Sequence, residues 1–337
     1  MRRKSDWCCG QPQMPAYCNA KENIMKNMVL KAAVLGALGL VSVQAAATGL
    51  VNIPDTGFAV GSDTSPYTLC NTTGNFGSDD DALAFPTTSS NNTCAVFPAN
   101  QNTAPESGYS LIASSTRNII LNDSAHTNNT NVTVGSVVDR IWRNSSTNEC
   151  IYGARVTMSN VDYDLNTAGT QYIEFNDVVR SGFSGRSVSA GYYRYTSAPV
   201  ADGVVYRIGR TNVSVQHRAD LSDESAPASG YVAQPLTSPT PANTPINGVE
   251  AWDDTTLPVP DADEQSATLG SDYVDFTTDL NYLDDDGGNS RNSSYLYVKS
   301  TCSSSTASTS AGALSFRQTA QEESPWITIN ITGYVPN

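Results

Sequence analysis

The chain has few of the residues on which several large classes of protein depend. Beyond residue 47 it contains one lysine, Lys299, and two histidines, His126 and His217. Against 13 basic residues this part has 31 acidic ones, which gives a net charge of −18. Such an acidic surface repels nucleic-acid phosphates and anionic membranes, so nucleic-acid binding is excluded.

Motifs for several kinds of catalysis are also missing. The sequence has no His-Glu-x-x-His zinc motif, no phosphate-binding loop, no dinucleotide fingerprint and no Gly-x-Ser-x-Gly elbow. His217 falls in an alternating strand pattern, where a packed structural histidine is the more common interpretation. A histidine-based metal site or a serine triad is therefore not expected.

Long apolar runs are scarce as well. The run at residues 32–43 has about twelve residues, fewer than the ~20 that a membrane-spanning helix needs. It follows a basic head and precedes the small residues Gln-Ala-Ala-Ala, a pattern typical of a secretory signal peptide at residues 25–47. Cleavage is expected after Ala45 or Ala47. The mature chain then has no membrane span and works outside the cytoplasm, as a periplasmic or secreted protein.

Residues 1–24 precede this signal and contain three cysteines and mixed charges. A signal peptide should begin close to its basic head, so a start codon assigned too early, with Met25 or Met28 as the true start, is the simplest interpretation. A cytoplasmic tail in front of a membrane anchor is the alternative.

Four cysteines remain after the signal: Cys70, Cys94, Cys150 and Cys302. An even number in an oxidising compartment favours two disulfides, and three pairings are open. The pairing Cys70–Cys94 with Cys150–Cys302 is preferred, because the first closes a short polar loop and the second joins two strand ends. Free thiols are the alternative.

Ser, Thr and Asn are abundant and strong helix formers are scarce, which favours strands and turns. The clearest hairpin pairs residues 132–143 with 150–158 across a polar turn. The other expected strands lie at 48–62, 108–113, 118–121, 171–180, 187–195, 204–209, 211–218, 273–277, 294–299, 312–317 and 326–335. One short helical turn is expected within 175–183, before Gly182.

This pattern predicts an all-β fold, an antiparallel β-sandwich or jelly-roll-like domain with long polar loops. A single secreted domain is expected over 48–337. Residues 225–267 contain seven prolines and are interpreted as a surface excursion of that domain.

Calcium is the one cofactor that the sequence indicates. Hard divalent cations bind several carboxylate and carbonyl oxygens on a flexible turn. The first candidate is Asp284, Asp285, Asp286 and Asn289, where two glycines permit sharp turns. A weaker one is Asp162, Asp164 and Asn166, at alternating positions; Asp79–Asp81 is a third acidic cluster. Solvated acidic turns are the alternative for all three.

These features favour an exported bacterial β-sandwich with a non-catalytic binding or structural role at the cell surface, in the periplasm or in the extracellular matrix. The rival hypothesis is a secreted hydrolase of polysaccharides that acts through paired carboxylates, with Glu174 and Asp177 as the first pair to inspect. An enzyme predicts two facing acids, one with a raised pKa, in a concave cleft.

The partner is not defined by the sequence, but two kinds of contact are open. Clustered tyrosines (Tyr192, Tyr193, Tyr195, Tyr295 and Tyr297) could stack on a surface glycan, although ordinary sheet packing is the more common role. The alternating strand at 326–335 could add to a neighbouring copy's sheet, although closing its own sheet is the simpler expectation.

Overall fold

The computed structural model of the protein describes residues 49–60, 63–70, 86–88, 94–194, 205, 207–212, 269–283, 291–318 and 327–337. Several sequence predictions fall outside these residues. They are the extension at 1–24, the signal peptide at 25–47, the excursion at 225–267, the acidic clusters at 79–81 and 284–289, and His217.

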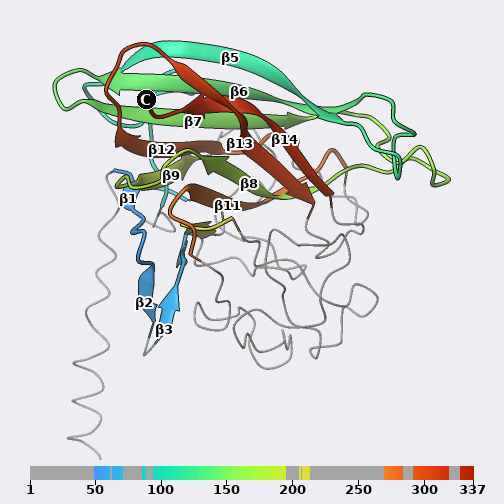
Figure 1. Ribbon diagram of the computed structural model, residues 1–337, viewed down its shortest axis with the longest axis horizontal. Coiled ribbons are helices and arrows are strands. Elements are labelled where there is room, and N and C mark those ends of the chain that lie inside the picture. Colours follow the sequence, from blue (N-terminus) through green and yellow to red (C-terminus); the bar gives the residue numbers. More distant parts are fainter. Residues whose placement is uncertain are drawn as a thin grey trace, which may run out of the picture. The chain divides into compact units, whose positions relative to one another are not determined.

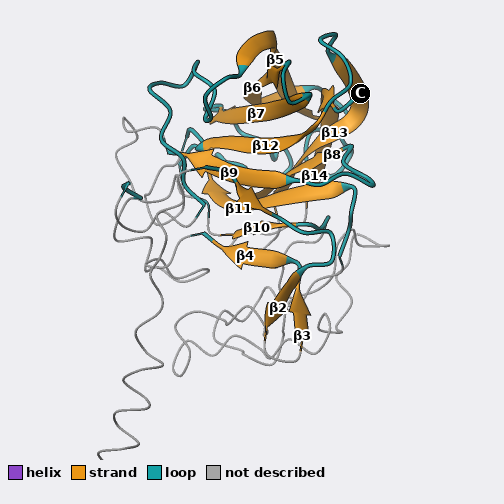
Figure 2. Ribbon diagram, turned by 90° about the vertical axis from the view of Figure 1, so that its left-hand side faces the viewer, coloured by secondary structure: helices purple, strands orange, loops and turns teal. Residues whose placement is uncertain are grey.

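The described residues form two antiparallel six-stranded sheets that pack against each other, as Figures 1 and 2 show. Sheet 1 has the order β1 (Val51–Asn52), β9 (Ser189–Tyr193), β12 (Tyr295–Thr301), β7 (Glu149–Met158), β6 (Val132–Asn144), β5 (Ser110–Leu121). Sheet 2 has the order β14 (Ile327–Val335), β13 (Ser308–Gln318), β8 (Phe175–Ser181), β11 (Tyr273–Leu280), β10 (Arg207–Gly209), β4 (Tyr67–Leu69). A separate hairpin pairs β2 (Phe58–Val60) with β3 (Asp63–Ser65). The predicted all-β sandwich is confirmed.

The core lies between the two sheets and is built by alternation of side chains along each strand. Val178, Phe276 and Phe316 of sheet 2 belong to the same buried cluster as Val137 and Val156 of sheet 1. None of the five is more than 2% exposed. Burying one such side chain contributes about 1.5–3 kcal/mol, so this layer is the main source of stability.

The predicted central hairpin is present as β6 and β7. Ten residue pairs join the two strands in continuous register, from Gly135 opposite Met158 to Asn144 opposite Glu149. Asn148 in the connecting turn adopts a φ of 55°, a left-handed conformation that asparagine tolerates better than most residues. The polar turn expected from the sequence therefore connects β6 to β7.

The helical turn expected within residues 175–183 is wrong, because this segment is strand β8. β8 lies between β13 and β11 and pairs with both, so sheet pairing overrides the weak local helix signal. Gly182 nevertheless ends the element, with a φ of 104°. A Cβ at this position would lie 2.9 Å from Val335 Cγ1, so the close approach of the last strand also requires glycine.

The two short strands expected at 108–113 and 118–121 are one continuous strand, β5. It pairs with β6 along its whole length, with register shifts at Leu111/Ala113 and Ile119/Ile120. Such bulges accommodate extra residues without ending the pairing, and the polar residues 114–118 between the two shifts are all paired with β6.

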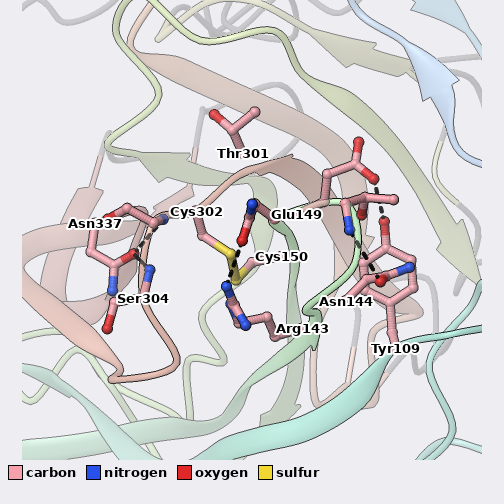
Figure 3. Close-up of a disulfide and its surroundings, with 12 residues drawn as sticks. Tyr109, Arg143, Asn144, Glu149, Cys150, Thr301, Cys302, Ser304 and Asn337 are labelled. Carbon is pink, nitrogen blue, oxygen red and sulfur yellow. Dashed lines mark hydrogen bonds between the residues drawn. A yellow bond between two sulfur atoms is a disulfide. The ribbon is translucent and has the colours of Figure 1, made fainter.

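Both disulfides have the predicted pairing. The Cα atoms are 4.9 Å apart in Cys70–Cys94 and 5.6 Å apart in Cys150–Cys302. The second bridge lies where β7 and β12 pair, and Figure 3 shows it near Asn337, whose side-chain Oδ1 accepts a hydrogen bond from the Ser304 backbone N–H. Two native disulfides indicate an oxidising environment.

The C-terminal strand β14 pairs with β13 of its own chain and is the last strand of sheet 2. A buried ionic cluster ties it to the rest of the sandwich. Asp139 on β6 is fully buried and accepts hydrogen bonds from Arg180 Nη2 at 2.7 Å, Arg117 Nη1 at 3.0 Å and the Tyr334 N–H at 2.8 Å. Arg180 also donates to the Tyr334 carbonyl oxygen, so both backbone groups of Tyr334 are held.

Candidate functional site

A row of polar side chains lies on the face of sheet 2 that points away from sheet 1. In register across neighbouring strands it contains Arg317 (β13), Asp177 (β8), Thr277 (β11) and Arg207 (β10). Adjacent residues such as Phe276 point into the core, so alternation turns these four side chains outward. All four are at most 3% exposed, so the row is buried although it lies outside the sandwich core.

Asp275 and Tyr67 extend this row. Asp275 lies two residues before Thr277 on β11 and therefore on the same face. Tyr67, on β4, reaches past β10 and donates a hydrogen bond of 3.4 Å to Asp275 Oδ2. Its ring passes over Gly209, where a Cβ would lie only 2.6 Å from Tyr67 Cδ1. The missing side chain at Gly209 thus lets the hydroxyl reach Asp275.

Asp177 and Asp275 form a carboxyl pair. Both are completely buried, and they are diagonal neighbours on one face of β8 and β11. Burial, and then the neighbouring charge of Asp177, raise the pKa of Asp275 well above its ordinary range. Burial and the charges of both aspartates likewise raise the pKa of Tyr67. The chemistry this arrangement offers is the retention of a proton on a carboxyl group at a pH where exposed aspartates have lost theirs.

The acid pair first chosen from the sequence, Glu174 and Asp177, is not the pair that the fold brings together. Glu174 accepts a hydrogen bond from Asn176 Nδ2, and its backbone N–H donates to Gln318 Oε1 at 3.1 Å. Asp177 instead lies against Asp275 and accepts from Thr277 Oγ1 at 3.5 Å. One of the two predicted residues therefore belongs to the pair.

Asp275 was missed because its local sequence is that of an ordinary half-exposed strand. In Tyr273-Val-Asp-Phe-Thr, apolar and polar residues alternate, and an acid at a polar position is normally solvated. The informative signal would have been two acids on the same face of two neighbouring strands. Which strands become neighbours cannot be read from one sequence.

The weaker calcium candidate, Asp162, Asp164 and Asn166, lies in a loop after β7. The carboxylate oxygens of this candidate accept hydrogen bonds within the loop. Asp162 Oδ1 accepts from the backbone N–H groups of Asp164 and Gln171, and Asp164 Oδ1 accepts from the backbone N–H of Asn166. Hydrogen bonds, with that from Thr167 foremost, lower the pKa of the partly exposed Asp164. Among the residues that the structure describes, no three acidic, histidine or cysteine side chains converge as a metal site would need.

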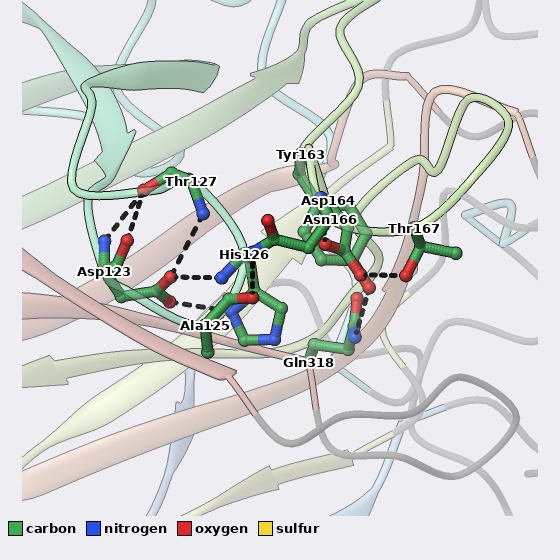
Figure 4. Close-up of polar contacts among 9 residues, drawn as sticks. All are labelled: Asp123, Ala125, His126, Thr127, Tyr163, Asp164, Asn166, Thr167 and Gln318. Atoms are coloured by element: carbon green, nitrogen blue, oxygen red, sulfur yellow. Dashed lines mark hydrogen bonds and ion pairs between the residues drawn. The ribbon is translucent and has the colours of Figure 1, made fainter.

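This loop is joined to the one that follows β5, as Figure 4 shows. Asn166 Nδ2 donates to the Ala125 carbonyl oxygen at 2.6 Å, and the Leu165 N–H donates to the His126 carbonyl oxygen at 2.8 Å. Asp123 lies 2.8 Å from His126 Nδ1. Partial burial raises the pKa of Asp123. The hydrogen bonds that it accepts from His126 and from nearby backbone N–H groups outweigh this effect and lower the pKa. These contacts give the acidic residues a role in fixing two loops.

The tyrosines proposed for glycan stacking are mostly buried. Tyr192, Tyr295 and Tyr297 are at most 1% exposed, and Tyr193 is half-buried, while Tyr195 lies outside the described residues. Tyr295 and Tyr297 pack with Trp142 in a second cluster on the outward face of sheet 1.

The segment 94–109, here called the cover segment, lies over this aromatic cluster. Gln101 accepts a hydrogen bond on its carbonyl oxygen from Arg140 Nη1 at 2.7 Å, and Trp142 Nε1 donates to the Asn102 carbonyl oxygen at 3.4 Å. An ion pair of 2.7 Å joins Glu106 to Lys299. The cover segment therefore occupies the face that a sugar ring would need.

No helix in the described part of the chain has the length and apolar character to cross a membrane. Comparison of the chain with known protein families, with curated proteins and with solved structures found no match.

Proposed function

We propose that this chain is an exported protein whose β-sandwich has a non-catalytic binding or structural role outside the cytoplasm. The two disulfides support export, because thiols stay reduced in the cytosol. The signal-like segment 25–47 supplies the route, and the acidic, lysine-poor composition suits a soluble or matrix-exposed protein.

The single observation that favours a non-catalytic role is the burial of the groups that could do chemistry. Asp177 and Asp275 are 0% exposed, so a substrate in solution would not touch them. A hydrolase needs its two carboxyls on either side of a bound sugar. Here the two carboxyls are buried diagonal neighbours on one face of sheet 2.

The location is tested by expressing the full chain in a bacterium with an outer membrane. Fractionation, N-terminal sequencing and alkylation of free thiols are then compared. The proposal expects a mature N-terminus after Ala45 or Ala47, no free thiols in the exported fraction, and no accumulation in the cytosol. Recovery of a reduced, uncleaved chain from the cytosol would overturn it.

The role is tested by incubating the purified mature protein with insoluble polysaccharides such as cellulose, chitin and peptidoglycan. Bound protein and released reducing sugar are measured in the same tubes. A binding module is retained on at least one of these without releasing sugar, whereas a structural module is retained on none and releases none. Release of sugar would contradict both.

A polysaccharide hydrolase remains the second candidate, and the raised pKa of Asp275 beside Asp177 favours it. In this case the carboxyl pair would have to become accessible when a substrate binds. Replacement of either aspartate by asparagine would then abolish sugar release, and the conservative change Asp164→Asn in the exposed loop would not.

Two further contacts belong to the same proposal. Because β14 is the edge strand of sheet 2, a second copy could add a strand there, and sedimentation velocity at increasing concentration tests for such a dimer. Calcium is the ligand proposed for Asp284, Asp285, Asp286 and Asn289. A thermal melt that is identical in calcium and in EDTA would remove the calcium site.

A further inference from the structure

The two carboxyl groups of the pair are buried on the same face of sheet 2. Val179 on β8 lies opposite Asp275 on β11, and Asp177 lies opposite Thr277, so the two aspartates are diagonal neighbours on one face. An ionised carboxylate only accepts hydrogen bonds, so two of them cannot bond to each other. A proton on one of them would supply the missing donor, and Asp275 Oδ1 is a buried oxygen to which none of the described residues donates.

The surroundings favour one proton rather than none or two. The described charged or titratable groups that face the pair are Tyr67 from β4, Arg207 from β10 and Arg317 from β13. The two arginines stabilise one negative charge on the pair. The complete burial of both carboxyls and their mutual repulsion oppose a second charge.

We propose that Asp177 and Asp275 share a single proton in the folded protein at neutral pH, and that this buried proton makes the stability of the fold fall as the pH rises. The strands beyond the pair at this edge of sheet 2 are short, since β10 and β4 have three residues each. Tyr67 connects them to Asp275, so the β10–β4 edge of sheet 2 is the part expected to open first when the proton is lost.

The direction of the effect follows from linkage. Burial raises the folded-state pKa of Asp275 above its unfolded value of about 3.9. The group's contribution to stability is complete below the unfolded pKa and is lost as the pH rises toward the folded pKa. Between the two pKa values, the folded state holds one proton that the unfolded chain has released. The unfolding equilibrium constant then rises about tenfold per pH unit from this pair.

The first measurement is the infrared spectrum of the folded, disulfide-intact protein at pH 7 in D₂O. The carbonyl stretch of a protonated carboxyl group is expected in the wild type and absent in both Asp177→Asn and Asp275→Asn. The matched control is Asp164→Asn, in an exposed loop, which should keep the band. A wild-type spectrum without the band overturns the proposal, whether or not any variant folds.

The second measurement is urea unfolding from pH 5 to pH 8. The ratio of the wild-type unfolding constant to that of Asp275→Asn should rise on the order of tenfold per pH unit as long as the pair keeps its proton. Every other titratable group is common to both proteins, so its effect cancels in the ratio. Asp164→Asn should give a flat ratio, because hydrogen bonds lower the pKa of Asp164 and it is ionised throughout this range. A flat ratio for Asp275→Asn overturns the proposal.

The outcome does not depend on where the protein is located or on what it binds. If the protein is exported but lacks the infrared band, the proposed function stands and the shared proton is refuted. If the protein shows the band but is found in the cytosol, the shared proton stands and the proposed function is refuted.

Discussion

Replacement of Asp139 by alanine is the sharpest test of how the sandwich is held together. Asp139 lies between the sheets and accepts three hydrogen bonds, two from arginines and one from the backbone of the last strand. The variant Asp139→Ala removes all three acceptor contacts at once. It leaves Arg180, whose side chain is only 2% exposed, as a buried charge without its carboxylate partner.

The expected loss in the free energy of unfolding is about 3–5 kcal/mol, the usual cost of removing one partner of a buried ion pair. Arg117 contributes less, because 17% of its side chain is exposed and water can replace part of the contact. Arg117→Ala should therefore cost about 1 kcal/mol. A loss of 3–5 kcal/mol is a large share of the 5–15 kcal/mol that stabilises a typical protein.

The assay is urea unfolding, followed by tryptophan fluorescence, to which the buried Trp142 contributes, and by circular dichroism. A double-mutant cycle with Arg180→Met completes it. Because the second change removes the orphaned charge, the double variant should lose less stability than the sum of the two single variants. Amide exchange should show β14 losing protection before β6 and β7, since Tyr334 is held through Asp139. A loss below 1 kcal/mol for Asp139→Ala, or strict additivity, would refute this reasoning.

Two other changes have expected outcomes. Removing the longer disulfide by paired Cys→Ala changes should cost about 5 kcal/mol and removing the shorter one about 3.5 kcal/mol, because the closed loops span 152 and 24 residues; equal midpoints in urea for the two variants would contradict this order. Gly209→Ala should cost roughly 1–3 kcal/mol, because its Cβ would collide with the Tyr67 ring. The tyrosine absorbance should then titrate at a lower pH, and an unchanged titration would show that Tyr67 does not depend on Gly209.

Much of the fold could be predicted from the sequence because the evidence is local. Alternation in the segments at 132–143 and 150–158, with a polar turn between them, is enough to predict a hairpin. The shortage of helix formers and the even number of cysteines lead to an all-β, doubly cross-linked chain. Where the local evidence was weak, at residues 175–183, the prediction was wrong because two neighbouring strands decide the conformation of β8.

The candidate site could be predicted only in part. Asp177 was selected because it is an acid near an expected turn, and Glu174 was the acid considered with it. The acid that the fold places diagonally beside Asp177 is Asp275 on β11, and β8 and β11 are neighbours only because of the strand order of sheet 2. Of the predicted glycan-stacking tyrosines, Tyr295 and Tyr297 are buried because the cover segment lies over their cluster, and Tyr192 is buried because it belongs to the core.

The sequence by itself determined the class of the fold, the central hairpin and the number of cysteines available for cross-links, since composition, alternation and turn residues act over a few neighbouring positions. The tertiary structure alone decided which acids meet, which charges are buried and which aromatic residues are covered. The physical reason is that a residue's exposure and the pKa of its side chain depend on the strands beside it, and pairing between strands far apart in the chain brings these neighbours together.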